Sequence, residues 1–215
     1  MMKTPWGYTL TTATKLTDFL NPAEFGLYTN GKFSANDSRI AVNIPSATRS
    51  IQNYCGWHIY PNLECEMVYR VADLRDSFVG SDLLIQLPAT FVSSVTSILL
   101  NAVKTDDGWT GDEITDYDLD ESGLIRIYDV DYCDKRTKIR IVYNAGVDVE
   151  QMDLIKELVA HRVVHSVTSS YGVMSETAGS VSVSYNASWA GNTRSTALPD
   201  DNKEILAPFK VKGVY

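Results

Sequence analysis

The sequence predicts an α+β fold in which a small helical core is interrupted by an inserted antiparallel β domain. Apolar side chains recur at helical spacing in two regions, whereas the region between them contains short strand-like runs separated by turns rich in Gly, Asp and Ser. An apolar content of 44% over 215 residues is sufficient for a buried core. The expected order is an extended N-terminal arm (1–33), the first core helices (34–60), the β domain (61–147), a long core helix (148–178), an amphipathic strand (179–190) and a C-terminal anchor segment with a short helix (191–215).

The composition argues against several classes of protein. A net charge of -8 is unsuited to gripping nucleic acid through a basic surface, because duplex affinity comes largely from neutralised phosphates. No apolar stretch follows Lys3 as in a signal peptide, and none approaches the roughly 18 to 20 residues that span a bilayer, so we expect a soluble, unprocessed chain. Cys55, Cys65 and Cys133 lack metal-ligand spacing, which favours reduced thiols.

The N-terminal arm has a composition unlike that of the rest of the chain. Thr, Gly and aromatic residues are mixed there with Pro5 and Pro22, which is typical of an extended segment with at most a short helix. The aromatic side chains need a surface to lie on, so we expect this arm to contact another part of the protein.

The first core helices are predicted from capping residues and apolar spacing. Asn36 or Asp37 caps a turn of helix, and Pro45 is expected to open a second helix as its first residue. One side of this second helix comprises Ala47, Ile51, Tyr54 and His58. Gly56 is expected to end it.

Five runs predict the strands of the β domain, namely LECEMVYRV, DLLIQL, VTSILL, LIRIYDV and KIRIVY. Between two of them Asp116, Asp118 and Asp120 alternate as calcium ligands do in an EF-hand loop. The match fails, because Glu121 stands where that loop needs glycine and Ile127 stands where it needs a bidentate glutamate. We therefore expect a polar strand followed by a turn.

The long core helix has two apolar stripes. It begins at Asp148, with Gln151 at the spacing of a capping box, and is expected to continue to about Ser170. The first stripe comprises Met152, Ile155, Val159, Val163 and Val167. The second, on nearly the opposite side, comprises Leu154, Leu158, His161 and His165. Only the sector with Asp153, Lys156 and Glu157 looks solvated, so the second stripe is a candidate subunit interface.

Two of these histidines permit a second interpretation. His161 and His165 are four residues apart on one helical face, like the zinc-binding histidines of H-E-x-x-H enzymes. However, Arg162 replaces the catalytic glutamate, and no third ligand has a matching spacing. The sequence also lacks a nucleophile elbow, a P-loop and a G-x-G-x-x-G run. We expect no cofactor and no catalytic site, with a metal-dependent enzyme as an alternative.

Two segments after the long helix are candidates for contacts with other chains. Val181, Val183 and Tyr185 alternate with polar residues, which predicts one amphipathic strand without an obvious hairpin mate. This strand is expected to pair with the β domain, the arm or another subunit. A short helix then ends before Pro208, and its apolar side is suited either to a partner's groove or to the subunit's own core.

Four segments occur in the order found in a known family: SATRSIQNYCGWHI, YNAGVDVEQMDLIKELVAHRVVH, SETAGSVSVSY and ILAPFK. Through them the chain resembles the head-tail connector proteins of long-tailed bacteriophages, which are also called adaptor or head completion proteins. The resemblance covers less than half of the chain. Minimal connectors are small helical bundles, so the resemblance implies that the β domain is an insertion and gives it no role.

The resemblance implies a structural virion protein, made in the host cytoplasm and present at the capsid-tail junction. It would form a homo-oligomeric ring, dodecameric in the family, between the portal protein and the next connector or tail-completion protein. Double-stranded DNA would pass through the lumen without specific binding, and no membrane is involved. Candidate portal-binding residues are then Ile205, Leu206, Phe209 and Lys210. The acidic balance suits such a channel. Some of the carboxylates between Asp106 and Asp134, or on the helix edge at Asp153 and Glu157, are expected to face it, with a solvated outer surface as the alternative.

A third class of function also fits the sequence. The β domain at 61–147 has the strand content of a stand-alone β-sandwich binding module, for which the helices would be a stalk.

Overall fold

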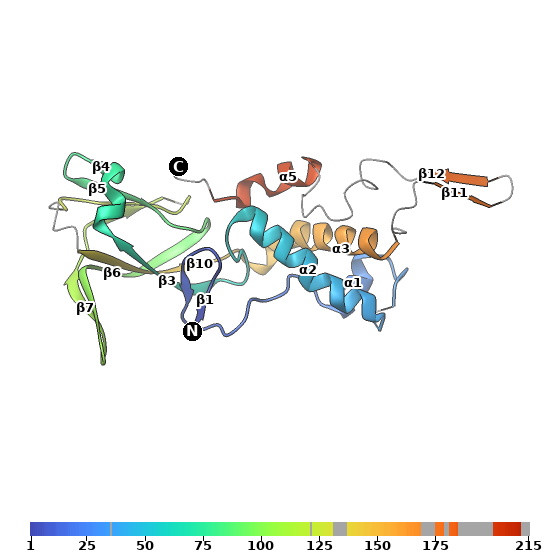
Figure 1. Cartoon of the computed structure of the whole chain (residues 1–215), viewed down its shortest axis with the longest axis horizontal. Helices are drawn as coiled ribbons and strands as arrows, with labels where there is room; N and C mark the ends of the chain where they lie inside the picture. Colours follow the sequence, from blue (N-terminus) through green and yellow to red (C-terminus); the bar gives the residue numbers. More distant parts are fainter. Residues whose placement is uncertain are drawn as a thin grey trace. The chain divides into compact units, whose positions relative to one another are not determined.

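The α+β fold expected from the sequence is confirmed by a computed structural model (Figure 1). The structure describes residues 1–215 except 35, 121, 131–136, 169–174, 179–180, 185–199 and 212–215. Contacts divide the chain into a β unit and a helical unit. The β unit comprises Met1–Thr17, Cys55–Met152 and Ala207–Tyr215, and the helical unit comprises Asp18–Tyr54 and Asp153–Leu206.

A six-stranded antiparallel sheet forms the larger part of the β unit. Its strands, in spatial order, are β1 (Met2–Lys3), β2 (Thr9–Leu10), β3 (Leu63–Arg70), β10 (Lys138–Ala145), β6 (Val92–Thr105) and β7 (Gly108–Glu113). In β10, Ile139, Ile141 and Tyr143 are fully buried and alternate with Lys138 and Arg140, which point to the other face. This alternation defines the inner and outer faces of the sheet.

Residues 1–17 belong to the β unit and contribute two short strands to this sheet, whereas we expected an extended arm. In β2, Thr9 lies opposite Glu66 and Leu10 lies opposite Cys65 of β3. Tyr8 and Leu10 are almost completely buried. The arm therefore supplies a hydrogen-bonding partner for part of β3, and its apolar side chains are buried in the core.

A four-stranded antiparallel sheet covers the inner face. Its order is β4 (Phe78–Val79), β5 (Asp82–Gln86), β9 (Leu124–Ile127) and β8 (Tyr117–Leu119), and a 3₁₀ segment η1 (Val71–Ser77) precedes β4. Leu83, Ile125 and Ile127 of this sheet are fully buried. The hydroxyl of Tyr69 on β3 donates to the carbonyl of Gln86 on β5 at 3.2 Å. The core of the β unit therefore lies between the two sheets.

The acidic stretch before β9 is a polar strand and a turn, as the sequence predicts. Asp120 follows the last residue of β8, and its side-chain oxygen accepts a hydrogen bond from the backbone N–H of Ser122 at 2.7 Å. Its carbonyl accepts a second hydrogen bond from the N–H of Gly123 at 2.9 Å. Gly123 has φ +81° and an added Cβ would approach the carbonyl oxygen of Ala89 to 2.4 Å, so this turn requires glycine.

The helical unit is built from helices of different length. They are α1 (Pro22–Tyr28), α2 (Ser38–Cys55), α3 (Asp153–Thr168) and α5 (Asp200–Leu206), and only the last residue of α2, Cys55, is assigned to the β unit. The 3₁₀ turns η2 (Val149–Met152) and η3 (Ala207–Phe209) adjoin α3 and α5 and belong to the β unit. α1 has a complete capping box between Asn21 and Glu24.

α2 is one helix, whereas we expected Pro45 to open a second one. Pro45 lies inside it, where proline removes one backbone hydrogen bond. Ile40, Ile44 and Ile51, on both sides of the proline, are all buried, so packing stabilises the helix across that position. Asp37 caps the helix through the N–H of Arg39, and Gly56, with φ +84°, follows its last residue as the sequence predicts.

The predicted amphipathic strand has a partner in its own chain, contrary to our expectation. β12 (Val181–Ser184) pairs with β11 (Ser175–Ala178) in an antiparallel hairpin, with Ala178 opposite Val181. The sequence does contain a signal for this hairpin, because two residues, Gly179 and Ser180, separate the strands. The first strand was not predicted, because the sequence SETA at 175–178 is polar and has no alternation of apolar and polar residues.

Candidate subunit and portal interfaces

The first stripe of α3 forms part of the core, as the sequence predicts. Ile155, Val159 and Val163 are fully buried, together with Met152 in the preceding turn. The N–H of Asp148 donates to the Gln151 side chain at 3.3 Å, which is one half of the expected capping arrangement. One face of α3 is therefore buried in the core.

The second stripe of α3 is divided between the core and the surface. Leu158 is only 8% exposed, whereas Leu154 is 47% exposed. The His161 side chain is 75% exposed and His165 is half-buried. The structure therefore places Leu158 in the core and leaves Leu154 and His161 on the surface.

The sector of α3 that looks solvated in the sequence contacts α1. The hydroxyl of Tyr28 donates to Asp153 Oδ1 at 3.1 Å, and Lys156 Nζ lies 3.1 Å from Glu24 Oε1. Glu24 raises the pKa of Lys156 through this contact. The expectation of a solvated sector is therefore wrong for Lys156, which α1 partly covers, whereas Asp153 and Glu157 are exposed as expected.

The two histidines of α3 are not joined by a third metal-binding side chain within the described residues. The acidic group nearest to His161 is Glu157, at 4.0 Å. Burial lowers the pKa of His165, and the neighbouring Arg162 cation lowers it further. A positive charge at this position is unfavourable for a bound cation.

The C-terminal segment packs on the β unit. The indole nitrogen of Trp57 donates to the carbonyl of Phe209 at 2.6 Å. The ring of Phe91 stacks on both of these residues, with centroid distances of 6.4 Å to Trp57 and 5.4 Å to Phe209. The N–H of Val211 donates to the carbonyl of Cys55 at 3.0 Å. Residues 207–211 therefore cover part of the subunit's own core.

The four candidate portal-binding residues differ in how far this packing buries them. Leu206 is completely buried and Phe209 is 9% exposed. Ile205 is half-buried and Lys210 is exposed. Burial within the chain favours the core-covering alternative for Leu206 and Phe209, while Ile205 and Lys210 lie where a partner can reach them.

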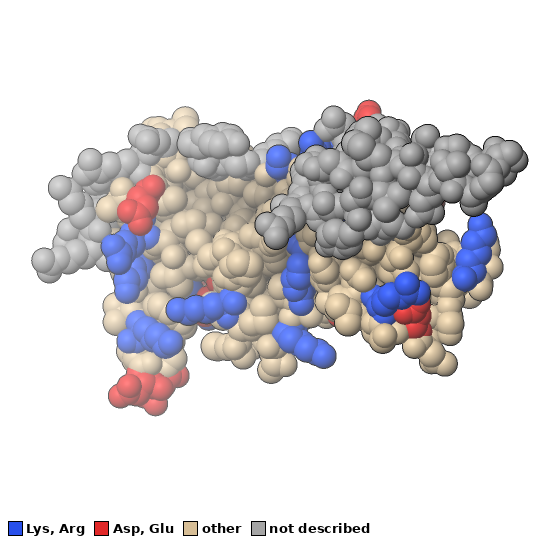
Figure 2. All heavy atoms as spheres, turned by 45° about the vertical axis from the view of Figure 1, so that its right-hand side comes forward, with Lys and Arg blue, Asp and Glu red and all other residues tan. Residues whose placement is uncertain are grey.

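The remaining candidates are only partly described. Val181 and Val183 lie in β12, whose side chains are outside the description, and Tyr185 lies outside the described residues. Between Asp106 and Asp120 every described carboxylate is exposed, whereas Asp131 and Asp134 lie outside the described residues. On the face shown in Figure 2, acidic side chains lie in small separate groups among more numerous basic ones.

His58 is the centre of a buried hydrogen-bond network that sequence reasoning missed. Its Nε2 lies 3.0 Å from the carbonyl of Ala145 and 3.1 Å from that of Pro61, so Nε2 must carry a proton. Nδ1 then accepts from the Tyr8 hydroxyl at 2.8 Å. The network joins the N-terminal strands, the turn before β3 and the end of β10. Helical spacing had placed His58 on a helix, and no sequence signal indicated its distant partners.

Burial lowers the pKa of His58 to about 4, although the hydrogen bonds to Ala145 and Pro61 partly oppose this shift. An unfolded histidine has a pKa of about 6.5, so the unfolded chain takes up a proton first as the pH falls. The stability that depends on neutral His58 is complete above about pH 6.5 and is lost progressively toward pH 4. We expect a loss of about 3 kcal/mol in the free energy of unfolding over this window.

Urea unfolding at several pH values measures this loss. His58→Gln should flatten the stability profile between pH 6.5 and 4, whereas the control His161→Gln should leave it unchanged, because His161 is exposed. An equally steep profile in His58→Gln would show that other groups cause the acid sensitivity.

No described helix has both the length and the apolar composition that a membrane span requires.

No family model and no curated protein match this chain. Among solved structures, it is similar to a chain from the neck of an empty GTA particle computed with C6 symmetry, with 16% identity and a TM-score of 0.48, over 72% of this chain and 82% of that one. A chain from the neck of a native GTA particle computed with C12 symmetry gives 15% identity and a TM-score of 0.45, over 71% and 81%.

Proposed function

We propose that this chain is a structural, non-enzymatic subunit of the head-tail junction of a bacteriophage or related particle, where it forms a ring beneath the portal. The segments that resemble connector proteins contribute α2, α3, the β11–β12 hairpin and the residues from α5 to η3. The resemblance is therefore concentrated in the helical part of the chain. The β unit is the part that the resemblance leaves without a role.

Exposed apolar side chains on the helical unit give this proposal its main support. Leu27 on α1 is 78% exposed, Val42 on α2 is 72% exposed, and Leu154 on α3 is 47% exposed. Single exposed apolar side chains are common on soluble proteins, but here each of the helices α1, α2 and α3 has one. A subunit that buries these side chains against copies of itself would gain stability on assembly.

The distribution of charge fits a ring through which DNA passes. The β unit has 18 acidic and 12 basic residues, and the helical unit has 9 and 7. The β unit thus contributes most of the negative charge. Carboxylates that line the channel would repel phosphates and let DNA pass without adhesion. In this proposal the neighbours of the ring are the portal protein and the next connector or tail-completion protein.

Replacing Leu154 with Asp is expected to prevent ring assembly without unfolding the subunit. A carboxylate at this exposed position costs little in the free chain, but it would be desolvated at a subunit contact. We expect the fraction of protein in rings to fall about tenfold or more, measured by light scattering after size-exclusion chromatography. Leu158 is unsuitable for this test, because it is buried and its replacement by Asp would unfold the chain.

Ser166→Asp is the matched control, because Ser166 is an exposed residue of the same helix. Both variants should keep the melting temperature of the parent. Normal assembly of Leu154→Asp would show that this part of α3 is outside the subunit contact. Binding to portal-bearing capsids, measured by co-sedimentation, tests the proposed location, and a parent chain that never co-sediments would contradict it.

A further inference from the structure

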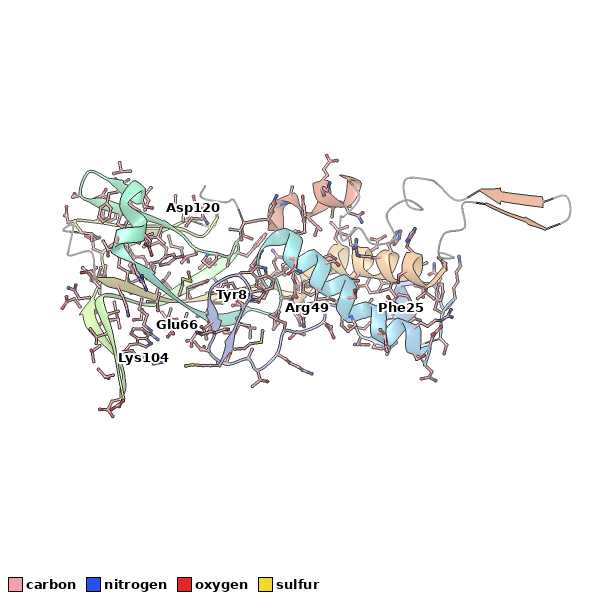
Figure 3. The ribbon with its side chains drawn as sticks, in the orientation of Figure 1. Tyr8, Phe25, Arg49, Glu66, Lys104 and Asp120 are labelled. Carbon is pink, nitrogen blue, oxygen red and sulfur yellow. The ribbon has the colours of Figure 1, made fainter. Side chains whose placement is uncertain are left out.

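The outer face of the six-stranded sheet has a charge opposite to that of the β unit as a whole. Register places Arg70 beside Lys138, and Lys104 beside Trp109. Lys3 lies opposite Thr9, and Thr9 lies opposite Glu66. Residues directly opposite each other point to the same side of a sheet, so Lys3 and Glu66 are both on the outer face. The cations of this face are Lys3, Arg70, Lys104, Lys138 and Arg140. Its anions are Glu64, Glu66 and Glu113. Glu66 and Lys104 are labelled in Figure 3.

The centre of this face is apolar and holds an ordered arginine. Arg140 lies 2.6 Å from Glu66 Oε2 and its guanidinium lies over the Trp109 ring, 5.6 Å from the centroid. Val68 and Leu99, which flank Arg140 on the adjacent strands, are half-buried. An apolar centre with Trp and Arg, surrounded by charged groups, is typical of a protein-binding surface.

The cations at the rim of this face are available for a partner. Arg70, Lys104 and Lys138 are exposed, and none has a carboxylate within 4.0 Å among the described residues. On the left of the view in Figure 2, at the β unit, several basic side chains lie near one another. Within the described residues no carboxylate pairs with these three cations, so they can attract an acidic surface of a partner.

A complementary surface exists on the same chain. We define the acidic edge as Asp106, Asp107, Asp112, Asp116, Asp118 and Asp120, which are all exposed. No Lys or Arg occurs between positions 105 and 125. β7 is an edge strand of the first sheet, and β8 is an edge strand of the second. Because Leu119 pairs with the buried Ile125, its neighbour Asp118 points outward from the second sheet, away from the outer face of the first.

We infer that the outer face of one copy receives the acidic edge of the next copy in the ring. This inference rests on the proposed function and assigns the β unit a role in ring formation. It places the six carboxylates of the acidic edge at the contact between copies, so other carboxylates of the β unit would line the channel. The two surfaces differ, so the contact is head-to-tail, the type of contact that can close into a ring. The apolar centre would supply burial, and the charges would select the partner and its orientation.

A second copy fits this face better than nucleic acid does. Three glutamates on the same face would repel phosphates, and Arg140 is already paired with Glu66. The charges on the edge strand β7 also disfavour pairing of another strand along it, which leaves side-chain docking as the mode of contact. Each copy of the chain carries one outer face and one acidic edge, so the two surfaces are available in equal numbers.

Charge reversal on separate copies tests this contact. The face variant has Arg70→Glu and Lys138→Glu, and the edge variant has Asp116→Lys and Asp118→Lys. Each alone is expected to form at least about tenfold fewer rings than the parent, because like charges then meet at every contact. A 1:1 mixture should restore rings, because each reversed surface meets the other variant's complementary one. Native mass spectrometry should find equal numbers of the two variants in the restored rings.

The outcomes separate this inference from the proposed function. If the parent forms rings and either variant assembles equally well, or the mixture fails to restore assembly by folded variants, the inference is overturned and the ring proposal stands. If the parent remains monomeric with its portal, the proposed function and the inference both fail. Fluorescence anisotropy with labelled duplex DNA provides the last comparison. Binding by the parent that the face variant loses, without restored rings in the mixture, would assign the face to DNA instead.

Discussion

Deleting residues 207–215 is expected to lower the free energy of unfolding by at least about 3 kcal/mol. The deletion removes the Phe209 ring from its stack on Phe91, and it removes the carbonyl that accepts the Trp57 indole N–H. Trp57 is completely buried, so its N–H would lose a partner where water has little access. Urea unfolding followed by tryptophan fluorescence measures the loss.

Deletion of residues 212–215 alone is the matched control, because it retains Phe209 and Val211. The shorter deletion should keep the stability of the parent. If the longer deletion is equally stable and only its binding to portal-bearing capsids is lost, the segment is a portal anchor and its packing on the β unit contributes little.

Gly146→Ala is expected to destabilise the β unit by about 3 kcal/mol or more. Gly146 has φ +151°, which side chains rarely adopt, and an added Cβ would lie 2.3 Å from the Cα of Asn62. The obstacle is backbone, so it cannot move aside as a side chain could. This backbone contact lies directly after β10, next to the carbonyl of Ala145 that accepts from His58. Thermal unfolding of the variant measures the effect.

Gly80→Ala separates backbone strain from steric overlap. Gly80 also has a positive φ, +69°, but no atom lies within 4 Å of an added Cβ. This control should lose only about 1 kcal/mol. Equal losses in the two variants would mean that the approach of Asn62 to Gly146 is unimportant for stability.

The regular strands and helices follow from local patterns in the sequence. LECEMVYR and KIRIVYNA alternate along their length, and they form neighbouring strands of eight residues each. By contrast, β1 and β2 have two residues each, which is too short for any periodicity to be recognised. Their pairing with β3 depends on tertiary contacts, and the sequence therefore suggested an extended arm.

The candidate interface residues were harder to predict, because burial depends on partners distant in the chain. The apolar spacing of α3 correctly indicated two apolar sides, but it could not show that Leu158 is buried while Leu154 is exposed. The contact of Trp57 with Phe209 joins residues 152 positions apart. A helical wheel contains no information about such contacts, so the C-terminal helix could equally have been an anchor or a cover.

Electron microscopy of the purified chain, alone and with portal-bearing capsids, tests the central claim most directly. We expect closed rings with an open centre, and we expect capsids to show added density at the portal vertex only. The ring number follows from rotational averaging of the end views. A chain that stays monomeric in the presence of the portal and adds no density at that vertex would contradict the assignment to the head-tail junction.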